Sequence, residues 1–230
     1  MNTSLSTLRD FKVGIPCSGA ILRGDVAIPA GAEALVIFAH GSGSSRLSPR
    51  NRLIAGELHR KGIGTLLFDL LTQEEAVDEA RSGELRLNIP MRTHRLLMAT
   101  AWCRQEDGLK DMTLGYFGTS TGAAAALAAA TQTKEIRAVV ARGARTDLAG
   151  DRLERITAPT LLIVGELDFP LLQLNRETYQ ILQCVKHLSI VSGATHLFLE
   201  PDALEHVAEL AANWFELHLI QSQTPTNPKS

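Results

Sequence analysis

Cysteine is scarce in this sequence, and the cysteines that it has lie far apart. There are three, Cys17, Cys103 and Cys184, among 230 residues, and no two of them form a CxxC pair. This excludes a disulfide framework and a zinc site built on paired thiolates, and it is typical of a reduced, cytoplasmic protein. The seven histidines form no HxH or HExxH motif, so we expect neither a metal nor a cofactor.

The chain also lacks an excess of charge of either sign and a long hydrophobic run. Its formal net charge is −2, which is not typical of a protein that binds nucleic acid. The longest apolar stretch, Ala123–Ala130, is far shorter than the ~20 residues that a membrane span needs. Met1–Phe11 has no basic head before an apolar block, so we expect no signal peptide.

Short apolar runs recur along the chain, and most of them are continuous rather than alternating. Each run is too short for a helix, and the pattern is typical of strands that are buried on both faces of a parallel sheet. The runs are Leu35–Ala39, Thr65–Phe68, Leu114–Phe117, Ala138–Ala141, Leu161–Val164 and Leu188–Val191. The segments between them predict helices at Pro49–Lys61, Pro90–Gln105, Thr121–Thr131, Pro170–Gln183 and Pro201–Leu219.

This alternation predicts an α/β protein with three layers around a mostly parallel sheet of about eight strands. Ala20–Ile28 is expected to form an antiparallel lead-in at one edge. We expect a single domain over residues 1–220 without a separate lid domain, and a disordered tail at 221–230, which is polar. Leu70–Pro90 is long and acidic, and is predicted to be a mobile loop beside the site.

A serine motif stands between a predicted strand and an alanine-rich predicted helix. Gly118–Thr119–Ser120–Thr121–Gly122 has the G-x-S-x-G pattern, which presents a serine as a nucleophile at a sharp strand-to-helix turn. The glycines relieve clashes with the neighbouring strand and helix, and the helix N-terminus favours the negative charge that develops. An ordinary strand-to-helix turn is the alternative, so the interpretation depends on a base and an acid elsewhere in the chain.

Two later segments supply candidates for the base and the acid. In enzymes with this motif the order along the chain is Ser, then Asp or Glu, then His. Asp168 and His196 each follow a predicted strand, and the carboxyl ends of parallel strands meet at one edge of a sheet. We predict Ser120 as the nucleophile, His196 as general base and then general acid, and Asp168 as the residue that orients His196. Glu166 is the alternative acid.

The oxyanion that forms during acyl transfer needs two N–H donors. The N–H of Thr121, directly after the nucleophile, is predicted to be one of them. The other is expected from the glycine-rich loop that follows Leu35–Ala39, where we predict the Ser42 N–H, with Gly41 as the second choice. His40, in the same loop, is predicted to tie the loop internally rather than to act in catalysis.

The glycine-rich loop also allows a dinucleotide-binding interpretation. The run GSGSSR follows a predicted strand and precedes a predicted helix, and Asp69 ends the next strand. Arg46 occupies the third glycine position of that pattern, however, and would crowd the contact between helix and strand. This interpretation also leaves Ser120 and its two partners without a role. No G-K-[ST] follows a glycine loop, so a P-loop is excluded.

Arginines near the predicted site are candidates for substrate binding. Arg142 and Arg145 follow a predicted strand end and could hold a carboxylate or a phosphate. Pairing with Asp147 or Asp151 is the alternative. The same two interpretations apply to Arg46 and Arg50.

The motifs HGSGSS, GTSTG, VGELD and GATHLF resemble the α/β-hydrolase superfamily, on its dienelactone-hydrolase-like branch, over about residues 12–219. The resemblance implies an α/β-hydrolase sandwich and a serine-hydrolase type of enzyme. True dienelactone hydrolases have cysteine where this chain has Ser120, so lactone specificity is not carried over. The run HGSGSSRLSPRN also resembles hydrolase domains joined to phosphoribosyltransferases, although no such partner domain is expected within this chain.

The sequence thus predicts a serine hydrolase that cleaves a small acyl ester, or a lactone or thioester, through an acyl-enzyme on Ser120. Its expected partner is a small-molecule ester, not nucleic acid or a membrane. A non-catalytic binding or accessory module with the same fold is the alternative. Such relatives usually lose a triad member, whereas Ser120, Asp168 and His196 are all present.

Overall fold

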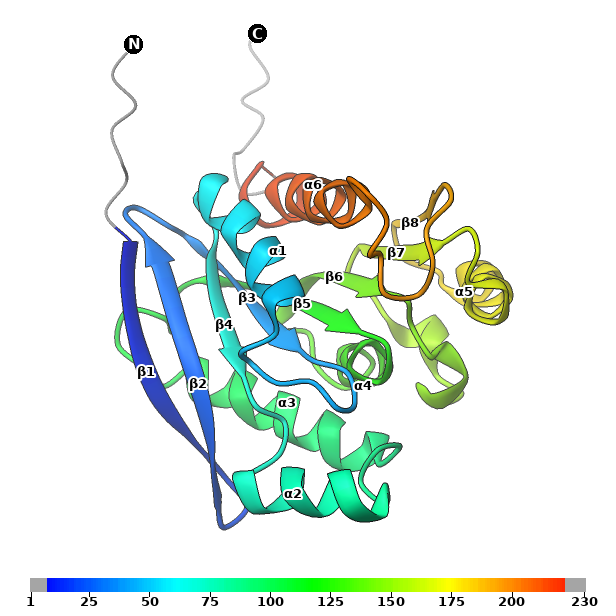
Figure 1. Cartoon of the computed structure of the whole chain (residues 1–230). Helices are drawn as coiled ribbons and strands as arrows, with labels where there is room; N and C mark the ends of the chain where they lie inside the picture. The colour runs from blue at the N-terminus through cyan, green and yellow to red at the C-terminus, as the bar shows by residue number, and fades with distance from the viewer. Residues whose placement is uncertain (1–7, 222–230) are drawn as a thin grey trace, which may run out of the picture.

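One sheet lies at the centre of the computed structural model, which describes residues 8–221. Its strands are β1 (Leu8–Cys17), β2 (Ala20–Pro29), β3 (Ala34–Ala39), β4 (Gly64–Phe68), β5 (Thr113–Thr119), β6 (Ile136–Arg142), β7 (Thr160–Gly165) and β8 (Lys186–Val191). The eight strands lie in the order β1-β2-β4-β3-β5-β6-β7-β8. The six strands β3 to β8 are parallel to one another, whereas β1 and β2 form an antiparallel hairpin beside β4 (Figure 1). This confirms the predicted sheet and its antiparallel lead-in.

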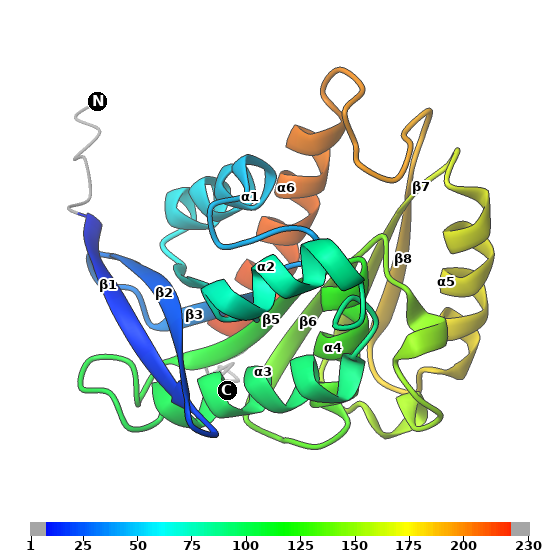
Figure 2. The ribbon, with the colours of Figure 1, turned by 60° about the horizontal axis from the view of Figure 1, so that its bottom comes forward.

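Helices cover both faces of the sheet and complete the three layers (Figure 2). They are α1 (Pro49–Arg60), α2 (Gln73–Ser82), α3 (Ile89–Cys103), α4 (Thr121–Ala130), α5 (Phe169–Ile181) and α6 (Ala203–Phe215). The pair α1 and α6 packs on one face, and α3, α4 and α5 pack on the other. None of the described helices is long and apolar enough to cross a membrane.

The central strands are buried on both faces because their side chains alternate between two hydrophobic cores. In β3, Leu35 and Ile37 face α3 and α4, whereas Val36 and Phe38 face α1 and α6. All six residues of β3 are buried. The continuous apolar runs of the sequence therefore correspond to strands between two helical layers, as predicted.

The structure corrects the prediction of a long loop at Leu70–Pro90, because Gln73–Ser82 of this segment form helix α2. Thr72 and Glu75 form a capping box at its start, and Gly83 ends it with a φ of 72°. Two of its acidic side chains face arginines of α3: Glu75 contacts Arg95 at 2.6 Å, and Glu79 contacts the fully buried Arg92 at 3.0 Å. Two acidic residues of this segment are thus ion-pair partners of α3, and of these Glu79 is buried and Glu75 half-buried.

Two predictions about domain organisation remain open. The single domain over residues 1–220 stays a prediction. Of the predicted disordered tail, only Gln221 belongs to the described part of the chain, and 222–230 lie outside it.

Candidate active site

Ser120 stands in a strained turn between β5 and α4. Its φ is 53° and its ψ is −118°, a conformation that residues with a side chain rarely adopt. Hydrogen bonds on both sides hold it there. Its N–H donates to the Arg142 carbonyl at 3.0 Å, and its own carbonyl accepts from the N–H groups of Ala123 and Ala124 at 3.1 and 3.2 Å. The backbone of Ser120 is therefore held in place at the carboxyl edge of the sheet, and its side chain is half-buried there.

Glycines on either side of Ser120 allow the strands and α4 to come close together. A Cβ atom on Gly122 would lie 2.1 Å from the Ala39 carbonyl oxygen, and one on Gly118 would lie 2.5 Å from the Cα of Ala123. Both distances are far below any van der Waals contact. The reason given for the two glycines of the motif is thus confirmed.

The predicted acid and base meet at the same edge of the sheet. Asp168 lies between β7 and α5, and its Oδ2 is 2.7 Å from Nδ1 of His196. The Asp168 carboxylate is 11% exposed and the His196 ring is 38% exposed. With a proton on Nδ1 donated to Asp168, the Nε2 atom of His196 is left as a proton acceptor.

The backbone at the end of β6 links His196 to Ser120. The His196 ring lies against Gly143, where a Cβ atom would be 3.1 Å from the ring Cε1. Gly143 directly follows Arg142, whose carbonyl holds the Ser120 N–H. Among residues 8–221, no hydrogen bond joins Ser120 Oγ to His196, so their direct contact stays a prediction. Such contacts are often long in free enzymes and tighten in the substrate complex.

Glu166, the alternative acid, has other partners. Its carboxylate accepts hydrogen bonds from the Gly193 N–H and the Ser192 hydroxyl, both at 2.8 Å. These bonds lower the pKa of Glu166, the Gly193 N–H first. Since Asp168 and not Glu166 contacts His196, the geometry favours the predicted acid.

The predicted oxyanion donors lie close together, but both candidates from the glycine-rich loop are engaged. The Ser42 N–H donates to the Thr121 hydroxyl at 2.9 Å, and the Gly41 N–H donates to the Thr119 hydroxyl at 3.1 Å. Thr121 is the first residue of α4, where a backbone N–H has no partner within the helix. In this structure Ser42 is therefore not a free second donor, because its N–H already has the Thr121 hydroxyl as its acceptor. A substrate oxygen would have to replace that hydroxyl.

The oxyanion loop has further ties, one of which was predicted. Nε2 of His40 accepts the Leu70 N–H at 2.9 Å, so Nδ1 carries the proton and donates to the Gly41 carbonyl at 2.9 Å. This confirms His40 as an internal tie. The Ser42 hydroxyl donates to the Arg86 carbonyl at 2.5 Å, which brings the connection between α2 and α3 onto the same loop.

Burial of His40 gives the stability of the protein a pH dependence. Desolvation lowers the pKa of His40 from 6.5 to about 4. Between these values the unfolded chain takes up a proton that the folded chain does not, so the free energy of unfolding should fall as the pH falls. The difference corresponds to about 3 kcal/mol.

We expect denaturant unfolding at pH 7 and pH 5 to show this fall in the wild type and a smaller one in His40→Gln. The exposed His187, on β8, provides the control variant His187→Gln, which should behave as the wild type. An undiminished pH dependence in His40→Gln would contradict the assignment.

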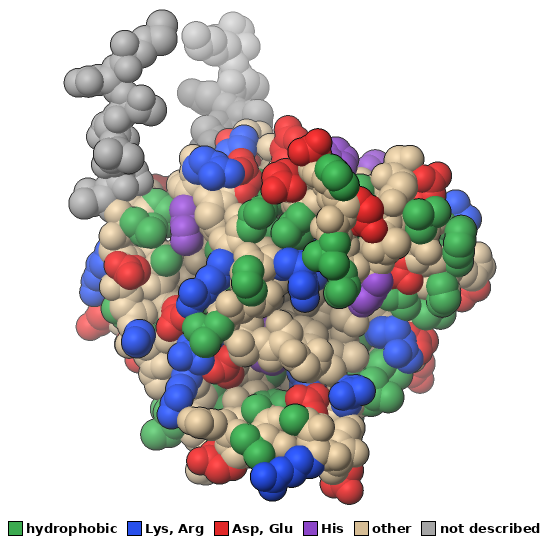
Figure 3. All heavy atoms as spheres, in the orientation of Figure 1, with side chains coloured by type: hydrophobic (Ala, Val, Ile, Leu, Met, Phe, Trp, Pro, Cys, Tyr) green, Lys and Arg blue, Asp and Glu red, His purple; other side chains and the backbone are tan. Residues whose placement is uncertain are grey.

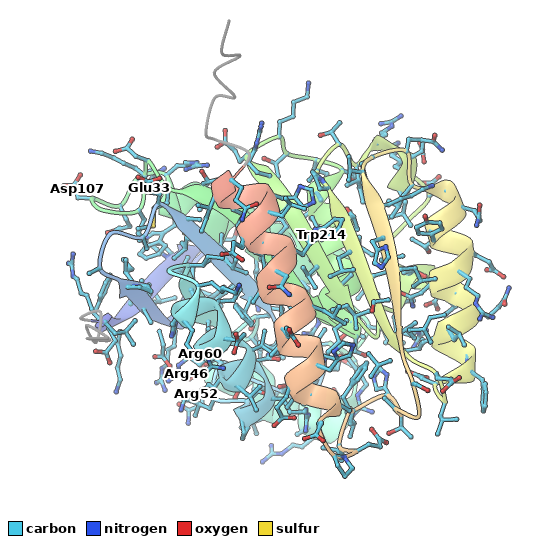
Figure 4. The ribbon with its side chains drawn as sticks, turned by 90° about the horizontal axis from the view of Figure 1, so that it is seen from above. Glu33, Arg46, Arg52, Arg60, Asp107 and Trp214 are labelled. Atoms are coloured by element: carbon cyan, nitrogen blue, oxygen red, sulfur yellow. The ribbon has the colours of Figure 1, made fainter. Side chains whose placement is uncertain are left out.

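The arginines near the site fall into two groups. Arg145 is paired with Asp147 at 2.7 and 2.8 Å, which raises the pKa of Arg145 and lowers that of Asp147. Arg46, labelled in Figure 4, pairs with Asp69. These two arginines have the acidic partners of the alternative interpretation, which the geometry favours for Arg145, whereas substrate binding by Arg145 stays a prediction. Arg142 has no acidic partner among residues 8–221.

A cavity of 1040 Å³ adjoins the oxyanion loop. It lies between this loop, α2 and the turn that joins β1 to β2, and its lining includes His40, Gly43 and Arg50. Ser120, Asp168 and His196 do not line it. In the part of the chain that the structure describes, no cluster of three or more His, Cys, Asp or Glu side chains has the arrangement of a metal site.

Sequence reasoning missed two features of this edge. Phe198, two residues after His196, lies under the Arg142 guanidinium at 5.5 Å from the ring centre and has a φ of 54°. The hydroxyls of Thr119 and Thr121 hold the oxyanion loop. The positive φ leaves no mark in the sequence, whereas a threonine on each side of the nucleophile was visible but had no assigned partner.

Comparison with known proteins gives this geometry a context. The sequence matches no family model. It is similar to a dienelactone hydrolase from Anabaena variabilis ATCC 29413, with 46% identity and a TM-score of 0.90 over 92% of this chain and 99% of that one. Est1E from Butyrivibrio proteoclasticus shares the fold at 17% identity, with a TM-score of 0.71 over 90% of this chain and 97% of its own. The esterase domain of a Rhodothermus marinus protein does so at 19% identity, with a TM-score of 0.72 over 92% of this chain and 99% of that domain.

Two curated proteins of Mycobacterium tuberculosis, from strains CDC 1551 / Oshkosh and H37Rv, also match. Both carry the name "Putative phosphoribosyl transferase", and each is 46% identical over 213 residues. The match covers 92% of this chain but only 47% of their length, so the chain spans about half of each. Its likeness to the Anabaena protein, in contrast, extends over nearly the whole of both chains. The chain belongs to the dienelactone-hydrolase-like branch of the α/β-hydrolase superfamily.

Proposed function

We propose that this protein is a serine hydrolase that cleaves small acyl esters through an acyl-enzyme on Ser120. The observation that carries the proposal is the 2.7 Å contact between Asp168 and His196 at the edge where Ser120 stands in a strained turn. The similarity to a dienelactone hydrolase and to esterases supports a hydrolase of this fold. The substrate and the serine mechanism are our own assignments.

In the proposed reaction Nε2 of His196 takes the proton of the Ser120 hydroxyl as Ser120 Oγ attacks the ester carbonyl carbon. The oxyanion accepts the Thr121 N–H, and the Ser42 N–H joins once the Thr121 hydroxyl moves aside. His196 then gives its proton to the leaving alcohol, and the carbonyl re-forms as an acyl-enzyme. Water, deprotonated by His196, releases the acid and restores Ser120. The Asp168 carboxylate orients His196 and stabilises the imidazolium.

Exposed hydrophobic side chains beside the acid and the base fit an acyl substrate. Leu167 and Phe169 stand on either side of Asp168 and are 47% and 67% exposed. Leu197 and Leu199 follow His196 and are 40% and 68% exposed. Apolar side chains at this density around polar groups are typical of a site that binds an apolar substituent.

A phosphoribosyl transferase activity is not proposed for this chain. The name comes from proteins of which the chain spans 47%, whereas the dienelactone hydrolase is matched over 99% of its length. The second candidate is a binding module without turnover. The conformation of Ser120 argues against it, because a strained backbone at a site is retained when the site uses it.

The test combines labelling with turnover. A fluorophosphonate should label the wild type, with the modified peptide containing Ser120, and Ser120→Ala should not be labelled. In a panel of acyl esters, thioesters and lactones, turnover should then be highest with the esters. The contrary result would be a protein that is neither labelled nor active on any compound of the panel, but that binds a small molecule stoichiometrically. That result would favour the binding module over the enzyme.

A further inference from the structure

Arg142 is a buried cation without a counter-charge. Its side chain comes from the last residue of β6, the residue is 6% exposed, and its Nη1 atom is buried with no hydrogen-bond partner among the described residues. Burial, and then the positive charge of Arg50, lower the pKa of Arg142 to about 10. An unpaired buried guanidinium costs free energy, so the fold gains nothing from this charge by itself.

Arg50, in the first turn of α1, is the second cation at this place. It is half-buried, its Nε atom is buried without a partner, and it forms no ion pair with an acidic residue in the described chain. It also borders the 1040 Å³ cavity, which Arg142 does not line. The N-terminus of α1 adds its partial positive charge.

Other arginines around α1 are neutralised, which makes this pair an exception. Arg46 and Arg52 both reach Asp25, at 3.4 and 3.3 Å, and lie near one another at α1 (Figure 4). On the face seen in Figure 3, basic side chains lie among hydrophobic ones over α1 and beside the loop that precedes α6. Arg50 and Arg142 thus form a local positive centre in a region where the neighbouring charges cancel.

The backbone of Arg142 lies next to the nucleophile. The Arg142 carbonyl accepts the Ser120 N–H at 3.0 Å, and the following residue, Gly143, touches the His196 ring. The Arg142 guanidinium lies over Phe198, 5.5 Å from the ring centre, so the loop that carries His196 also positions the cation. A group bound by Arg142 would therefore lie at the edge of the sheet that carries Ser120 and His196.

We propose that Arg142 and Arg50 bind an anionic oxygen group, a carboxylate or a phosphate, on the ester that Ser120 cleaves. This rests on the proposed function and narrows its substrate class to acyl esters with a negative charge close to the scissile bond. Guanidinium groups suit both anions, because their N–H donors match the oxygens in pairs. The bound anion supplies the counter-charge that the protein lacks.

The first arm of the test compares two esters of equal chain length, neutral 4-nitrophenyl butyrate and the anionic mono-4-nitrophenyl succinate. In the wild type kcat/KM should favour the succinate ester. Arg142→Gln and Arg50→Gln should each lower this preference by about 10- to 100-fold, mainly through KM. Arg142→Lys should keep part of it. The controls remove the same charge nearby: Arg137→Gln, exposed on β6, and Arg52→Gln on α1 should leave the preference unchanged.

The second arm measures binding without turnover. Calorimetric titration of Ser120→Ala with succinate and with inorganic phosphate should detect one of them and so distinguish a carboxylate from a phosphate. The signal should disappear in Ser120→Ala with Arg142→Gln. Removing an unpaired buried charge should not lower the melting temperature, and a rise of about 2–4 °C is expected. If Arg142→Gln does not fold, the ester preference and the anion binding of Arg50→Gln provide the test of the anion site.

The outcomes separate this inference from the proposed function. Ester turnover with no preference for the anionic ester, and no binding of either anion, would overturn the anion site and leave the hydrolase intact. Anion binding that depends on Arg142, with no turnover of any ester, would keep the anion site and overturn the hydrolase.

Discussion

Replacing Ser120 by alanine is expected to lower ester turnover by about 10⁴- to 10⁶-fold, because no other group near His196 can form the acyl-enzyme. Folding should change little, since the side chain is small and half-buried and its hydroxyl forms no hydrogen bond with another described residue. The measurement is steady-state turnover of the best ester from the panel, at matched concentrations of folded protein.

The same experiment tests whether Ser120 acts with His196. His196→Ala should be nearly as damaging as Ser120→Ala, and the double variant should be little worse than either, because residues of one catalytic unit are not additive. Ser189→Ala and His187→Ala, which remove the same side-chain types from β8, are the controls. Undiminished turnover in both single site variants would refute the proposed triad.

Gly122→Ala is expected to be the most damaging small substitution for stability, by about 3–5 kcal/mol. The added methyl group would lie 2.1 Å from the Ala39 carbonyl oxygen and 2.4 Å from that of His40. Both are backbone atoms at the end of β3, so α4 would have to move away from the sheet. Denaturant unfolding, with turnover measured in parallel, provides the test.

Gly56→Ala is the matched control, because it adds the same methyl group to a helix. No atom lies within 4 Å of the position of its Cβ atom, and Gly56 stands inside α1. This variant should be more stable by about 0.5–1 kcal/mol, since alanine favours the helix. If the two variants were equally stable, the close packing of α4 on β3 would not matter in solution.

Much of the fold was predictable because the central strands are buried on both sides. Leu35–Ala39 and Leu161–Val164 contain no polar residue, so their pattern allowed little besides a parallel sheet between helices. Helix α2 was missed for the opposite reason. Glu75 and Glu79 are typical of a solvated surface, and only the structure places arginines of α3 against them.

In the site, chain order identified residues that the structure brings together, but not the partners of their hydrogen-bonding and charged groups. Asp168 and His196 follow separate strands of one sheet, and topology alone makes them meet. The engagement of the Ser42 N–H by Thr121, and the contact of Arg142 with Phe198, depend on rotamers and loop conformations that no spacing encodes. Arg145 and Arg142 are three residues apart and looked equivalent, yet an aspartate neutralises only Arg145.

The composition of α4 has a consequence for the order in which the molecule assembles. This helix has ten residues, eight of them from Ala123 to Ala130 alanine or leucine, and nearly all are buried against β3, β5 and α3. A helix of this length is marginal on its own in water, and alanine methyls offer little contact until their neighbours are in place. Those neighbours include β3 and β5, whose parallel pairing joins Leu35 to Leu114, a long loop closure that slows folding. We therefore expect the turn that carries Ser120 to form late, so that partly folded chains lack the nucleophile.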